Sequence, residues 1–257
     1  MKNKMPVLFI GHGSPMNAIE DNEFSRGWKL LSKELPKPKA ILCISAHWET
    51  NSVHVMASPQ PETIHDFGGF PKALFDVRYN APGSPDLAQR IANLVKITPV
   101  KLDNEWGLDH GSWSVLLPMY PNADIPVAQL SLDRTQPASF HYNLAKELAP
   151  LRDEGVLIIG SGDIVHNLRL FNFNASSSYD WAARFNDVVK EHIMSGNHAP
   201  LIDYKSFGQD ADFSVPTPEH YLPLLYTLGL QEPGEQVSFF NDIVISSISM
   251  TSFIVGK

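Results

Sequence analysis

The sequence predicts an α/β protein, a three-layer α/β/α sandwich with a central mixed, mostly parallel sheet. Short apolar runs alternate with segments in which apolar residues recur at helical spacing, the pattern of strands joined by covering helices. Most of these runs are continuously apolar, as in parallel strands buried on both faces. The 257 residues, 43% of them hydrophobic, are enough for one large domain with a sizeable core. We therefore expect residues 1–257 to form a single domain.

The expected strands follow the apolar runs in chain order. They are Val7–Ile10, Ala40–Ser45, Val53–Ala57, Val100–Leu102, Val127–Leu130, Val156–Gly160, Val237–Phe240 and Ile243–Ile254. The last of them alternates apolar and polar residues, which is typical of an antiparallel or edge strand. We expect it to form a hairpin with the strand before it.

Helices are expected over residues 84–97, 136–151 and 178–194, where apolar residues fall on one helical face. Ser84 or Asp86 supplies a start signal for the first of these helices. Residues 57–85 differ, because they are rich in proline, glycine and aromatic residues and have little periodicity. Long irregular stretches in compact domains are usually lids or binding loops. We interpret this stretch as an active-site loop, the alternative being a surface excursion without a function.

Three of the apolar runs end on a glycine- or serine-bearing turn that carries a histidine: His12, His47 and His166. Ligands of open α/β sheets bind outside the carboxyl ends of the strands, so these imidazoles should meet at one edge of the sheet. Imidazole is the commonest metal ligand among side chains and the usual acid–base group near neutral pH. Each histidine taken alone could be a hydrogen-bonded structural residue, but together they predict a metal-dependent enzyme.

Two further histidines stand next to helix start signals. Asp109 or Ser112 can cap a helix that begins near His110, where a neutral imidazole would suit substrate binding. Thr217 and Pro218 predict a helix whose first turn contains Glu219 and His220. Because adjacent residues on a helix face different directions, we expect at most one of Glu219 and His220 to share the pocket with the other histidines.

Composition excludes several classes of protein. The net charge of -8 argues against a nucleic-acid partner, which would need a basic face. No apolar stretch approaches the roughly 20 residues that span a bilayer, so we expect no membrane partner. The lone cysteine, Cys43, cannot form a disulfide within the chain and excludes a thiolate cluster, which fits a reducing cytoplasm. The oligomeric state stays open.

Six segments in this order resemble one known family. They are GHGSPMNAIEDN, ISAHWET, HDFGGFPKALFDVRYNAPGSP, LDHGSWSVL, GSGDIVHNL and TPEHYLPLLYTLG. The chain resembles the class III extradiol ring-cleavage dioxygenases of the LigB type over nearly its whole length, in the branch that contains 4,5-DOPA extradiol dioxygenase. The resemblance implies a single catalytic α/β/α domain. It also implies a non-heme Fe(II) enzyme that inserts both atoms of O2 into a catecholic ring, such as that of DOPA. The resemblance further implies that zinc can occupy the site.

The resemblance also implies roles for the histidines. His12 and His47 would be metal ligands, and His220 would be the third. Glu219 is the alternative third ligand, because the wider superfamily uses a glutamate there. His166 would be the acid–base histidine, with a place as a fourth ligand as its alternative, and His110 would be a catalytic residue that contacts the substrate.

The irregular segment would supply the remaining substrate contacts, through His65, Phe67 and Phe70. The partners implied are a small catecholic substrate and O2. Two other functions remain open at this point. One is a zinc-dependent hydrolase with Glu219 as its base, since zinc sites of this kind activate water. The other is a non-catalytic metal- or peptide-binding relative with the same fold.

Overall fold

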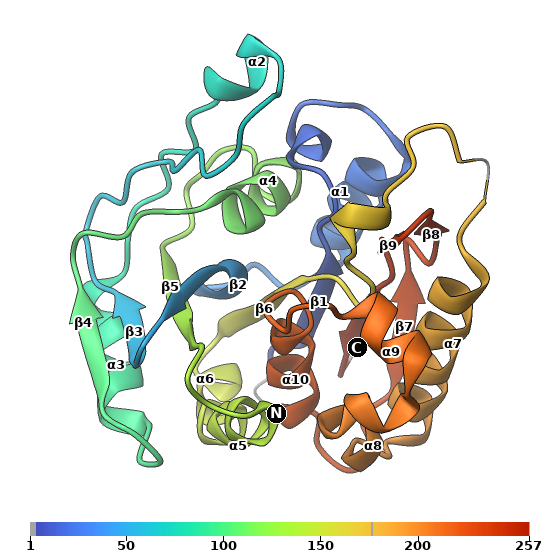
Figure 1. The fold of residues 1–257 in the computed structure, drawn as a ribbon. Helices are drawn as coiled ribbons and strands as arrows, with labels where there is room; N and C mark the ends of the chain where they lie inside the picture. The colour runs from blue at the N-terminus through green and yellow to red at the C-terminus, as the bar shows by residue number, and fades with distance from the viewer. Residues whose placement is uncertain (1–3, 176, 257) are drawn as a thin grey trace.

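The computed structural model describes residues 4–175 and 177–256. Within these residues, eight strands form one sheet in the order β4-β3-β5-β2-β6-β1-β10-β7 (Figure 1). The strands are β1 (Val7–Gly11), β2 (Ala40–Thr50), β3 (Val53–Met56), β4 (Val100–Asp103), β5 (Val127–Asp133), β6 (Val156–Gly162), β7 (Val237–Phe240) and β10 (Ser252–Val255). β8 (Val244–Ile245) and β9 (Ile248–Ser249) form a separate small hairpin.

The four central strands β5, β2, β6 and β1 run parallel to one another. On one side β3 pairs antiparallel with β5 and parallel with β4. On the other side β10 pairs antiparallel with both β1 and β7. The expected mixed, mostly parallel sheet is confirmed. The carboxyl ends of β1, β2, β5 and β6 therefore lie at the same edge.

Helices cover both faces of the sheet, which confirms the three-layer architecture. The α-helices are α1 (Glu23–Glu34), α2 (Lys72–Phe75), α3 (Pro85–Leu94), α4 (His110–Met119), α5 (Ala138–Glu147), α6 (Pro150–Asp153), α7 (Asp180–Ser195), α8 (Ala199–Ile202), α9 (Gln209–Ser214) and α10 (Leu222–Gly229). The described residues also form short 3-10 helices: η1 (Pro15–Ala18), η2 (Leu168–Leu170) and η3 (Tyr204–Phe207). None of the helices within the described ranges is long and apolar enough to cross a membrane.

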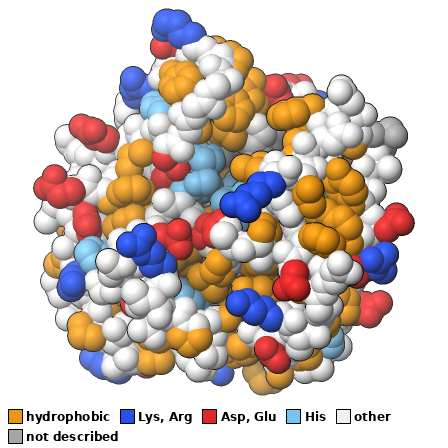
Figure 2. All heavy atoms as spheres, in the orientation of Figure 1, with side chains coloured by type: hydrophobic (Ala, Val, Ile, Leu, Met, Phe, Trp, Pro, Cys, Tyr) orange, Lys and Arg blue, Asp and Glu red, His pale blue; other side chains and the backbone are white. Residues whose placement is uncertain are grey.

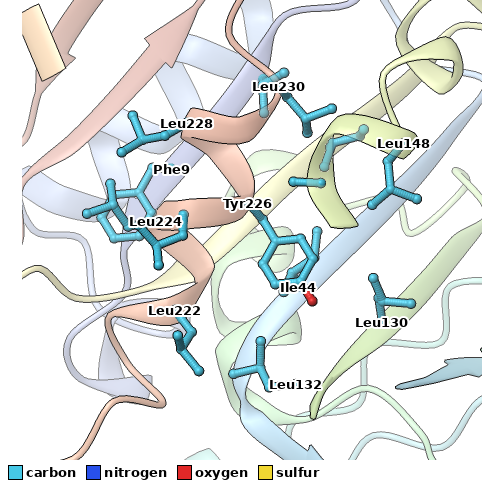
Figure 3. Packing of buried hydrophobic residues seen from close by; sticks show 14 of the residues in the cluster. Phe9, Ile44, Leu130, Leu132, Leu148, Leu222, Leu224, Tyr226, Leu228 and Leu230 are labelled. Carbon is cyan, nitrogen blue, oxygen red and sulfur yellow. The ribbon is translucent and has the colours of Figure 1, made fainter. Parts of the chain in front are cut away.

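Alternation along the strands divides the core into two clusters. In β1, Leu8 and Ile10 join the cluster with α1 and α4, whereas Val7 and Phe9 join the cluster with α3, α5, α7 and α10. Figure 3 shows part of the second cluster, in which Tyr226 of α10 lies with Ile44 of β2. Both faces of the central strands are thus buried, which fixes the sheet as the frame on which its carboxyl edge is built.

Two sequence-based boundaries are wrong. The strand expected over Ile243–Ile254 is broken into β8, β9 and β10, because Ser246 adopts a positive φ of 54° and turns the chain between β8 and β9. Its last part does pair antiparallel with β7, but it lies between β1 and β7 rather than at the edge. The helix expected from Pro218 begins only at Leu222. Pro223 lacks an N–H and favours the first turn of a helix, which fits this later start.

Other expectations needed smaller corrections. β2 continues to Thr50 through a register shift against β5 between Ile44 and Glu49, so His47 lies within the strand rather than after it. The helix expected over 136–151 is divided into α5 and α6, with Pro150 as the first residue of α6. The expected cap of the His110 helix is confirmed, because Asp109 accepts a hydrogen bond from the backbone of Ser112.

Candidate metal centre

Five histidines meet at the carboxyl edge of the central strands. His12 follows β1 directly, His47 lies in β2, and His220 lies in the turn before α10. The ring centroids of these three are 5.0–5.3 Å apart in each pair. His110 begins α4, and His166 lies four residues beyond β6. Figure 2 shows histidine side chains gathered near the centre of this face, between hydrophobic, acidic and basic side chains.

The hydrogen bonds of His12 define which of its nitrogens faces the other rings. Its Nδ1 lies 3.1 Å from Oγ of Ser161. That hydroxyl already donates its proton to the carbonyl of Gly111, at 2.5 Å. Ser161 must therefore accept from Nδ1–H of His12, which we assign as the protonated nitrogen. Nε2 of His12 then carries a lone pair, and it lies 3.2 Å from Nε2 of His47.

A carboxylate faces Nδ1 of both His47 and His220. Nδ1 of His47 lies 3.3 Å from Oδ2 of Asp66, and Nδ1 of His220 lies 3.1 Å from Oε1 of Glu219. A carboxylate that accepts from Nδ1–H leaves Nε2 free as the ligating atom, the usual arrangement around metal-bound histidines. Glu219 also accepts from the hydroxyl of Thr217. Its carboxylate therefore orients His220 in this structure.

The three imidazoles are held in the neutral form that binds metals. Burial lowers the pKa of His12 and of His220 well below the usual value, and the neighbouring histidines lower it further. Burial and the nearby His110 lower the pKa of His47 to about 3. Two lone pairs 3.2 Å apart repel each other unless a cation lies between them. The donor set therefore fits a divalent transition metal, for which neutral imidazole is a common ligand.

His110 lies closer to this group than a purely substrate-binding role requires. Its ring centroid is 3.8 Å from that of His47, and donor atoms of His12, His47 and His110 lie within 4.8 Å of one another. Its backbone N–H donates to Oδ1 of Asp66 at 3.0 Å. The next residue must be glycine, because a Cβ on Gly111 would lie 2.9 Å from Cδ2 of His47.

His166 lies on the other side of the group. Its ring stacks on that of His220, with centroids 3.5 Å apart and planes 7° from parallel. Donor atoms of His166, Glu219 and His220 lie within 4.8 Å of one another. Burial lowers the pKa of His166 to about 4 despite the charge of Glu219. At neutral pH the ring is therefore uncharged and has a lone pair to accept a proton.

The irregular segment brings aromatic rings to the edge of the centre. Phe67 lies 5.4 Å from the ring of His110, and Phe70 lies 5.3 Å from Phe67. His65 packs against Phe67 and Trp113, and its Nε2 lies 3.1 Å from the carbonyl of Val77. His65 thus stabilises the segment itself, whereas Phe67 is the residue that borders the histidines.

Sequence analysis overlooked two aspartates. Asp66 contacts both His47 and His110, and the hydrogen bonds from His110 together with the charges of both histidines outweigh its partial burial and lower its pKa. Asp163 is fully buried just beyond β6, with Oδ2 3.7 Å from Nε2 of His12, and burial raises its pKa well above the usual value. Its position directly after an apolar strand, like that of the histidines, was a signal available in the sequence.

Comparisons with known proteins give the class to which this fold and site belong. The family model for the catalytic LigB subunit of aromatic ring-opening dioxygenase matches residues 6–247, and the chain belongs to this family. It is accordingly an enzyme, an extradiol ring-cleavage dioxygenase.

Individual relatives show which members of this family the chain is similar to. The chain is 49% identical to 4,5-DOPA dioxygenase extradiol of Escherichia coli (strain K12), over 98% of this chain and 95% of that protein. It is 42% identical to the protein of the same name from Beta vulgaris, over 88% and 87% of the two chains. A crystal structure of an uncharacterized Escherichia coli K12 protein has a TM-score of 0.86 and 45% identity, over 98% of this chain and all of that one.

Proposed function

We propose that the chain is a single catalytic domain that uses Fe(II) and O2 to cleave catecholic rings such as that of DOPA. The observation that carries the proposal is the set of three imidazoles whose Nδ1 atoms face outward to a hydroxyl or a carboxylate and whose Nε2 atoms are left as ligands. The relatives named 4,5-DOPA dioxygenase extradiol support DOPA as the substrate class. Family membership favours this reading over a zinc hydrolase and over a non-catalytic relative.

His12, His47 and His220 would hold the metal, and the orphaned lone pairs described above are the feature that fits it. Held by these residues, Fe(II) would supply the open coordination positions and the redox chemistry that triplet O2 needs to react with a closed-shell ring. Zinc prefers similar ligands and would occupy the same donors without that redox chemistry.

The remaining residues act on protons and on the ring. His166, neutral at its lowered pKa, accepts the proton of a catechol hydroxyl and later returns it. His110, beside His47 and Phe67, donates a hydrogen bond to a substrate oxygen as charge develops there. Phe67 and Phe70 form an apolar wall for the ring, and His65 supports that wall from behind.

Oxygen uptake tests the proposal. Protein purified without oxygen and reloaded with Fe(II) should consume O2 in the presence of DOPA and give a yellow ring-opened product. Protein reloaded with Zn(II) serves as the matched control and should consume none. Absence of uptake with every catechol of a panel, despite one equivalent of bound Fe(II), would contradict the proposal.

The role of His166 needs a separate variant. We expect His166→Ala to lower turnover by about 100-fold or more, the usual range for a lost acid–base group, while the metal content stays at that of the wild type. If the metal is lost as well, His166 is a ligand rather than a proton carrier.

A further inference from the structure

Asp163 lies where two histidine-bearing segments cross. Its backbone N–H donates to the carbonyl of His220 at 2.8 Å, and its Oδ1 accepts from the backbone N–H of Gly13 at 3.2 Å. The backbone N–H of His12 in turn donates to Gly162, the residue before Asp163, at 3.1 Å. These bonds leave the carboxyl group of Asp163 little freedom to move.

The second oxygen of Asp163 has no hydrogen-bond partner among the residues that the structure describes. It is buried and lies 3.7 Å from Nε2 of His12, beyond hydrogen-bond distance. Nε2 of His12 carries a lone pair, because Ser161 accepts from Nδ1–H. Neither atom can therefore satisfy the other, and an unpaired carboxylate away from water is costly.

A cation would satisfy both atoms at once. Donor atoms of His12, Asp163 and His220 lie within 4.8 Å of one another, a spacing that allows them to share one metal ion. The three oriented imidazoles are neutral, so they leave both charges of a divalent metal uncompensated. Non-heme Fe(II) oxygenases commonly combine two histidines with one carboxylate.

We propose that Asp163 is a ligand of the same metal and supplies the carboxylate of its donor set. The inference rests on the proposed metal-dependent function. It assigns Glu219 to orienting His220 and Asp163 to the metal, so the carboxylate comes from the sheet edge rather than from the turn before α10.

The test is metal binding without substrate. Metal-free wild type and Asp163→Asn are titrated with Co(II), whose visible absorption bands report the ligand set. We expect the variant to bind about 100-fold more weakly or worse, beyond the range for residues that only orient ligands, and to show altered bands. The matched control is Asp133→Asn, a buried aspartate that ends β5 at the same edge and is hydrogen-bonded to Thr135. It should bind like the wild type.

Thermal unfolding of the metal-free proteins separates ligation from a structural role. Asn keeps an oxygen for the bond from Gly13 and removes the charge of the oxygen that has no partner within the described chain. The melting temperature of Asp163→Asn should therefore equal or exceed that of the wild type, and only the stabilisation by added metal should be lost. Wild-type Co(II) affinity and unchanged bands in Asp163→Asn would overturn the inference.

Crystals of Zn(II)-loaded wild type give a second measurement that does not depend on a variant. Anomalous scattering locates the ion, and a distance to Oδ2 of Asp163 of about 2.0–2.2 Å is expected for a ligand. A distance beyond about 3 Å would overturn the inference, since bonds to zinc are much shorter than this. Failure of the proposed function looks different: metal binds through Asp163, yet no catechol supports O2 uptake.

Discussion

The two sides of the metal centre are supported in different ways. On the side of β1 and β6, His12 is fixed by Ser161, and both lie in buried chain that backbone hydrogen bonds connect to the sheet. On the other side, His47 and His110 share Asp66, which belongs to the mostly irregular segment 57–85 and whose side chain is 20% exposed.

Because of this difference, we expect substitutions on the two sides to affect different properties, namely folding stability on one side and the orientation of the metal ligands on the other. A buried group that loses its hydrogen-bond partner is left unsatisfied in the core, so removal of the Ser161 hydroxyl on the β1–β6 side should lower the free energy of unfolding. A partly exposed carboxylate contributes little to folding, because water replaces it at small cost. Changes at Asp66 should instead alter how well the site holds its metal.

The largest expected effect is on the ligands themselves. His12→Ala and His47→Ala should each abolish stoichiometric metal binding and reduce O2 uptake to background, because each removes one of two facing Nε2 donors. Metal analysis after dialysis measures the result. Retention of one equivalent of metal by His47→Ala would show that His110 takes its place, since His12, His47 and His110 are also mutually close.

Gly111→Ala should displace His47 through a steric clash. The new Cβ would lie 2.4 Å from Oγ of Ser45 and 2.9 Å from Cδ2 of His47, so the chain must shift. We expect a loss of about 1–3 kcal/mol in the free energy of unfolding, with weakened metal binding. Gly68→Ala is the control, because a Cβ there meets nothing within 4 Å. Equal behaviour of the two variants in denaturant titration would contradict the argument.

Asp66→Asn and Ser161→Ala compare the two sides directly. The first should weaken metal binding about 10–100-fold with almost no change in stability, as for other residues that orient metal-bound histidines. The second should lower the free energy of unfolding of the metal-free protein by about 1–3 kcal/mol, because Nδ1 of buried His12 loses its acceptor. Calorimetric titration and urea unfolding measure the pair. A reversed pattern would refute the division of roles.

The smallest effect concerns Cys43 in β2. Burial raises the pKa of its thiol to about 12, although a hydrogen bond from Ser112 opposes this. Because the thiolate is the reactive form, a thiol reagent at pH 8 should label the folded protein very slowly. Removal of the metal should leave that rate unchanged if the sheet is independent of the site. Rapid labelling of the metal-free form would contradict this expectation and show that loss of the metal exposes Cys43 in the sheet.

Much of the fold follows from the apolar runs, because a parallel strand buried on both faces leaves a continuous signature. The position of His12 and His47 at the ends of such runs also predicted that they meet at the carboxyl edge of the sheet. Periodicity did not predict the late start of α10, in whose first turn Pro223 lies. It also did not predict that the chain turns at Ser246 and divides the expected strand Ile243–Ile254. The role of Asp163 could not be recognised from the sequence, because it depends on a three-dimensional fact, the missing hydrogen-bond partner of its Oδ2 among the described residues.

Asp66 has a consequence for attempts to redesign this enzyme. Residues 57–85 look like an exchangeable loop that could be replaced to change the preferred ring. The segment nevertheless carries the carboxylate that contacts both His47 and His110. A transplanted loop without an aspartate at this position would alter the catalyst together with its substrate range. Loop libraries should therefore hold Asp66 constant and vary the aromatic residues around it.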